Sequence, residues 1–90
     1  MQSLAVQHFH AEAMKLAEQA LRNLPRDKRN ISGLTLGISQ ETYDKVCLEV
    51  QECQKRIVDI AEKDAAADRV YQLNFHFFPV SRPLQERGNS

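Results

Sequence analysis

Four polar side chains in two short apolar stretches are the residues whose types and spacing could do chemistry. Thr35 lies in the first stretch, and Gln72, Asn74 and His76 alternate along the second. If the two stretches are neighbouring strands, these hydroxyl, amide and imidazole groups share one face and could line a pocket for a small-molecule effector. An ordinary solvent-facing strand would present the same residues, so the sequence leaves both interpretations open.

The chain contains no pattern typical of a catalytic or metal-binding site. It has no Ser/His/Asp or Cys/His arrangement, no H-E-x-x-H motif and no carboxylate pair with an arguable common geometry. His8 and His10 are two residues apart on a predicted helix, so their side chains point about 200° from each other and cannot chelate one metal. We therefore expect no enzymatic activity, no cofactor and no metal.

The two cysteines are expected to be free thiols. Cys47 and Cys53 are six residues apart on a predicted helix, which places them about 240° apart around its axis, too far round to bridge each other. A redox or metal role is the alternative interpretation.

Composition and charge limit the classes of partner. Twelve Lys and Arg balance twelve Asp and Glu, so no overall field attracts nucleic acid or an anionic membrane. No apolar run approaches the roughly 20 residues that span a bilayer, and no signal-peptide pattern opens the chain. We expect a cytoplasmic protein without membrane contact, with one domain over residues 1–81 and a flexible tail over residues 82–90.

Residues 70–80, which we call the aromatic segment, hold four of the six aromatic residues of the chain. Tyr71, Leu73, Phe75 and Phe77 fall on one side of an extended chain, and the polar residues named above fall on the other. This alternation predicts a strand with one apolar face.

Residues 31–38, which we call the glycine segment, are predicted to form a second, shorter strand. Leu34, Leu36 and Ile38 alternate onto one face, while Gly33 and Gly37 lie on the other and suggest a bulge or a close approach by another group. The G-x-G-x-x-G spacing of a dinucleotide-binding loop is absent.

Two helices are predicted to surround these segments. Residues 4–24 place apolar side chains at three- and four-residue steps until Pro25 ends the helix, and Ser39 is the expected N-cap of the second. The second helix carries a seam of apolar residues, which indicates a helix laid on a sheet or, alternatively, a coiled coil. The seam residues are Tyr43, Val46, Val50, Cys53, Ile57 and Ile60.

Together these elements predict an α/β fold, a two-layer α-β-α-β unit. The second helix is long enough to return to the start of the sheet, so the strands should be parallel, with both helices on one face. A two-stranded sheet is marginal alone, and its open face and edges need a partner. We therefore expect a homodimer that completes the sheet, with Val70, Gln72, Asn74 and His76 at the interface.

The order of segments resembles the C-terminal half of an uncharacterised bacterial family with many paralogues in some fibre-degrading and predatory bacteria. The resemblance covers residues 9–82, and its most specific pieces are the phrases RNISGLTL at residues 29–36 and DRVYQLNF at residues 68–75. Members of that family are similar to transcriptional regulators, with a winged-helix-like segment that precedes the part seen here. No catalytic residues are assigned in it. The resemblance implies that this chain is a shortened form or a short paralogue.

Two classes of function follow as expectations. The first is a non-catalytic regulatory and dimerisation domain of a transcriptional regulator, which would meet DNA only through an absent N-terminal domain. The second is a small-molecule-sensing domain that uses Thr35, Gln72, Asn74 and His76.

Overall fold

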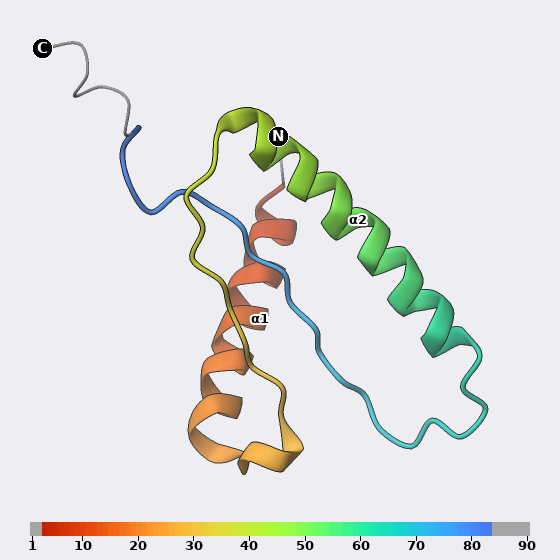
Figure 1. The fold of residues 1–90 in the computed structure, drawn as a ribbon. Helices are drawn as coiled ribbons and strands as arrows, with labels where there is room; N and C mark the ends of the chain where they lie inside the picture. Colours follow the sequence, from red (N-terminus) through yellow and green to blue (C-terminus); the bar gives the residue numbers. More distant parts are fainter. Residues whose placement is uncertain (1–2, 84–90) are drawn as a thin grey trace, which may run out of the picture.

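Two long helices and two extended segments make up the structure. The coordinates are a computed structural model that describes residues 3–83. Helix α1 spans Leu4–Asn23, a short 3-10 turn η1 spans Arg26–Lys28, and helix α2 spans Gln40–Glu62. The glycine segment connects η1 to α2, and the aromatic segment follows α2 (Figure 1).

The ends of α1 follow from local chemistry. The Ser3 hydroxyl accepts a hydrogen bond from the backbone N–H of Val6 at 3.2 Å, which satisfies one of the free donors of the first turn. Leu24, which precedes Pro25, has φ −97° and ψ 141°, the extended conformation that a following proline imposes. Arg29 then donates from Nε to the carbonyl oxygen of Leu24 at 3.1 Å.

The ends of α2 are equally well defined. Ser39 caps the helix by accepting from the backbone N–H of Thr42 at 3.2 Å, as predicted, and Glu41 lies in the positive first turn. At the other end, Asp64 accepts from the backbone N–H of Ala66 at 2.8 Å and turns the chain away from the helix axis. The two predicted helices are confirmed, with boundaries within one or two residues of those expected.

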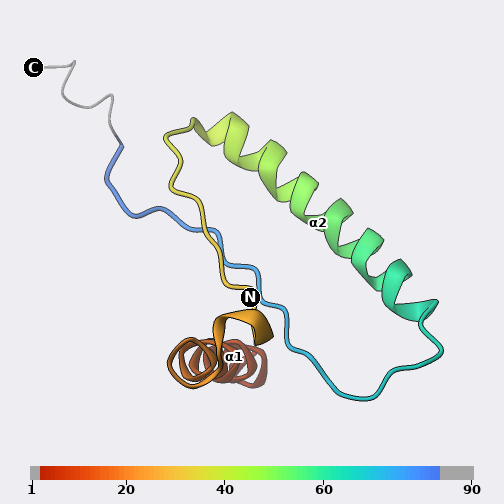
Figure 2. The ribbon, with the colours of Figure 1, turned by 60° about the horizontal axis from the view of Figure 1, so that its bottom comes forward.

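The predicted α/β fold is wrong. Within residues 3–83 there are helices and no strands, so the fold described is all-α. The glycine and aromatic segments are extended and run close to each other in both ribbon views, but neither segment takes part in a backbone–backbone hydrogen bond (Figures 1 and 2). The side-chain alternation was a correct guide to extended backbone, but a sheet also needs a ladder of backbone hydrogen bonds, which alternation does not specify.

The expected layering is also wrong. Instead of covering one face together, α1 and α2 lie on opposite sides of the extended segments (Figure 2). The side chains of the aromatic segment account for this arrangement, because Asn74 contacts α1 and Phe77 contacts α2. Residues three apart on an extended chain point to opposite sides, so the segment packs against one helix with each side. The expected sheet, which a second copy would complete, is therefore wrong, because the described residues form no strand.

Gly33 and Gly37 do not mark the predicted close approach. Both have φ outside the left-handed region, and no atom lies within 4 Å of the place that a Cβ would take at either residue.

The molecule is open. The radius of gyration is 17.1 Å, compared with about 12 Å for a compact domain of this length. Only Ala13, at 5% exposure, is buried among the described residues, and α1 and α2 do not pack against each other. The predicted domain of residues 1–81 thus contains very little core, and most of the predicted tail lies outside the described residues.

Neither helix combines the length with the apolar character that crossing a bilayer requires, within the part of the chain that the structure describes.

Candidate functional site

Asn74 lies where the aromatic segment meets α1. Its Nδ2 donates to the carbonyl oxygen of Ala13 at 3.0 Å, and its Oδ1 accepts from Nε2 of Gln72 at 3.0 Å. The amide is therefore held at both ends and half-buried. One N–H of the Asn74 amide and one lone pair of its oxygen are left without a partner among these contacts.

The remaining candidate residues are not gathered around Asn74. Thr35, Gln72 and His76 are exposed, and no hydrogen bond joins Thr35 or His76 to another residue in the described range. The best-formed hollows of the described surface are shallow and lie elsewhere, each along a single helix, at residues 4–11 of α1 and residues 51–58 of α2. The ligand-binding hypothesis stays a prediction, and no enclosed pocket supports it.

The predicted interface residues share this exposure. Val70 is 99% exposed, and Gln72 and His76 are also open to solvent. Asn74 is half-buried and donates a hydrogen bond to the carbonyl oxygen of Ala13. Their role in a dimer stays a prediction.

A second cluster joins the aromatic segment to α2. The rings of Tyr43 and Phe77 are stacked, with centroids 4.7 Å apart and planes inclined by 19°. One helical turn on from Tyr43, the Cys47 side chain forms a hydrogen bond with it, and this bond together with the negative charge of the thiolate raises the pKa of the Tyr43 phenol. Partial burial of the phenol and the nearby Asp44 carboxylate raise the pKa of Tyr43 further.

Neither the cysteines nor the histidines form a metal site. Cys47 and Cys53 are both free and half-buried. His10 meets the edge of the Phe9 ring, with centroids 5.4 Å apart. Across residues 3–83, no three His, Cys, Asp or Glu side chains come together in a way that could hold a metal ion.

The sequence interpretation missed two features of this region. The first is the close approach of the aromatic segment to the backbone of α1, which the small side chains of Ala13, Ala17 and Ala20 permit. These three alanines are the most covered residues of α1, and their spacing along one face was the available signal. The second is Arg29, whose side chain caps the end of α1.

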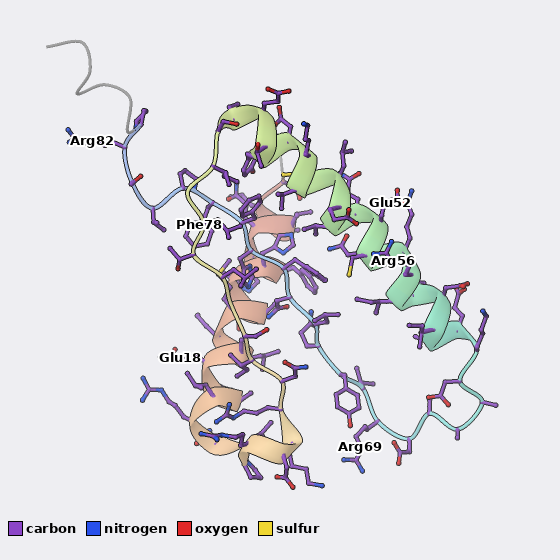
Figure 3. All side chains as sticks on the ribbon, in the orientation of Figure 1. Glu18, Glu52, Arg56, Arg69, Phe78 and Arg82 are labelled. Atoms are coloured by element: carbon purple, nitrogen blue, oxygen red, sulfur yellow. The ribbon has the colours of Figure 1, made fainter. Side chains whose placement is uncertain are left out.

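Many large apolar side chains of the described residues are exposed. Phe9 and Leu16 of α1 and Ile60 of α2 are each more than half exposed, and Leu34 in the glycine segment is 87% exposed. Charged side chains occupy the outer faces, where Glu18 points away from α2 and pairs with Arg22 at 3.0 Å (Figure 3). Exposed pairs of this kind contribute little to stability.

Comparison with protein families places the chain in a described family. Residues 1–80 match DUF4423, a domain of unknown function, and the chain belongs to that family. This match extends over most of the chain and assigns no activity to it. Neither the curated proteins nor the solved structures include a match.

Proposed function

We propose that this chain is a non-catalytic dimerisation and regulatory domain of a bacterial transcriptional regulator. The observation that supports the dimerisation role is the large total surface left uncovered, which includes many large apolar side chains. The accessible surface is 8893 Å², whereas a compact chain of 10.3 kDa exposes about 5,400 Å². A folded protein of this size would not keep such a surface in water, so a partner must cover part of it.

The size of the surplus favours a permanent partner over a transient one. It is on the order of 3,500 Å² for one chain, while a standard interface buries roughly 800 Å² on each partner. Obligate homodimers use the largest and most apolar interfaces. A second copy of the chain is always available as a partner. Two-fold pairing is also the commonest way in which soluble chains associate.

The charge balance is consistent with a domain that does not itself read DNA. Twelve basic residues are balanced by twelve acidic ones, and ion pairs within each helix, such as Lys15–Glu12 and Lys63–Asp59, occupy several of the basic side chains. DNA contact would fall to a preceding winged-helix segment, which the family resemblance of residues 9–82 implies. The regulatory half of the proposal rests on that resemblance.

A repressor fusion tests the proposal in cells. The chain is fused to a DNA-binding domain that represses its operator only as a dimer, and repression of a reporter gene is measured. We expect strong repression, because the chain would bring two DNA-binding domains together. Absence of repression from a well-expressed, soluble fusion would contradict the proposal.

Matched variants show whether apolar surface drives the association. Phe9 and Leu16 are seven residues apart on α1, so they lie near each other on one face, and both are exposed. We expect Phe9→Glu combined with Leu16→Glu to weaken repression at least tenfold. Glu18→Lys, on the outward face of the same helix, serves as the control and should repress like the parent.

A further inference from the structure

The two helices are connected in space only through the segments that lie between them. Helices α1 and α2 make no direct packing contact, and they lie on opposite sides of the extended segments (Figure 2). Whatever fixes the position of one helix relative to the other must therefore act through a residue of these segments.

The first anchor is Asn74 on α1. Its donor group bonds to the carbonyl oxygen of Ala13, a residue 61 positions earlier in the chain. Gln72 occupies the acceptor oxygen of the same amide and so fixes which end of Asn74 faces the helix. The site lies beside Ala13, the one buried residue of the described chain, so the bond is partly shielded from solvent.

The second anchor is Phe77 on α2. Its ring stacks on that of Tyr43, in the first turn of the helix. Because Asn74 and Phe77 are three residues apart, an extended backbone points them to opposite sides, one at each helix. A short stretch of four residues thus contacts both helices.

We propose that the aromatic segment is a two-ended clamp that sets the position of α1 relative to α2, and that Asn74 is its releasable end. After Asp64, the described chain that leads from α2 to Asn74 makes no backbone–backbone hydrogen bond. The aromatic segment makes none either. Loss of the Asn74 bond therefore frees α1 while Phe77 keeps the segment on α2. Asn74 acts as a positioning residue and holds the two helices at one separation.

Distance measurement between spin labels tests the clamp. In a Cys47→Ser background, one label is attached to Cys53 of α2 and the other to a Gln19→Cys substitution on the exposed surface of α1. Labelled chain is diluted with unlabelled chain, so that only distances within one copy are recorded. Circular dichroism checks that helix content is the same in every variant.

Three substitutions separate the clamp from a general effect of charge. Asn74→Ala removes the donor, and Asn74→Asp also places a carboxylate against the Ala13 carbonyl oxygen. His76→Asp adds the same charge on the same side of the segment, at an exposed residue. We expect a single distance in the parent and in His76→Asp, and a second, longer population in both Asn74 variants. Nuclear Overhauser contacts between the Tyr43 and Phe77 rings should persist in all of them.

The clamp is overturned if both Asn74 variants keep the single distance of the parent. It is equally overturned if His76→Asp shows the same second population, because the change would then come from added charge. Loss of the Tyr43–Phe77 ring contacts in Asn74→Ala would show that the two anchors do not release separately, and would also overturn the proposal.

Discussion

The side chain of Asn74 illustrates how one residue can take a role that its neighbours in sequence do not suggest. Alternation places it with Gln72 and His76 on a polar side, which reads as solvent-facing or ligand-facing. In the structure the Asn74 amide donates to the carbonyl oxygen of Ala13 in α1, while Gln72 and His76 are exposed. The sequence predicted a polar face that both helices leave open, and the contact of Asn74 with α1 could not be predicted because it joins residues far apart in the chain.

Tyr43 is the residue whose titration should respond to its surroundings. Hydrogen bonding with the Cys47 side chain and the negative charge of its thiolate both disfavour ionisation of the Tyr43 phenol. The pKa is raised in the folded chain, so the associated stability is present below about pH 10 and is lost as pH rises through the folded pKa. Alkaline unfolding should therefore begin above about pH 10.

Ultraviolet titration of the two tyrosines measures this effect. We expect the pKa of Tyr43 to lie above the ordinary value of a phenol, and Cys47→Ala to return it towards that value. Cys53→Ala is the control and should leave the titration unchanged. An unchanged Tyr43 titration in Cys47→Ala would show that the pair does not interact.

Among elements, the helices were predictable and the sheet was not. Ser39, Pro25 and the apolar spacing of each helix are local signals, and they specify where α1 and α2 begin and end. Two extended segments pair through backbone N–H and C=O groups, which every residue except proline carries in full. The side chains of Leu34 and Phe75 therefore do not indicate whether the segments pair. Phe75 was expected at the centre of a buried face, yet it is 39% exposed, and Phe77 is the better covered ring.

Phe77 and Phe78 should therefore differ in their contribution to stability. Phe77 stacks on Tyr43, whereas Phe78 is 65% exposed at the neighbouring position (Figure 3). We expect Phe77→Ala to lower the free energy of unfolding by about 0.5–1.5 kcal/mol more than Phe78→Ala, the range measured for aromatic pairs. Urea titration followed by circular dichroism checks this difference. Equal losses in the two variants would contradict the stacking.

At the scale of the whole molecule, the chain does not bury enough surface to account for its own folding. Ala13 is the only buried residue described, and the apolar faces of α1 and of the extended segments remain open. The spacing of Phe9 and Leu16 did not reveal this, because it is that of an ordinary core-facing stripe. The stripe indicates that a surface must be covered, and it does not indicate whether the same chain or another molecule covers it.

The central claim is that association completes this domain, and molar mass in solution tests it most directly. Sedimentation equilibrium of the chain at micromolar concentrations should give twice the 10.3 kDa of one copy, with thermal stability that rises with concentration. A mass of one chain, with cooperative unfolding independent of concentration, would show that a single copy buries its own core and would contradict the account.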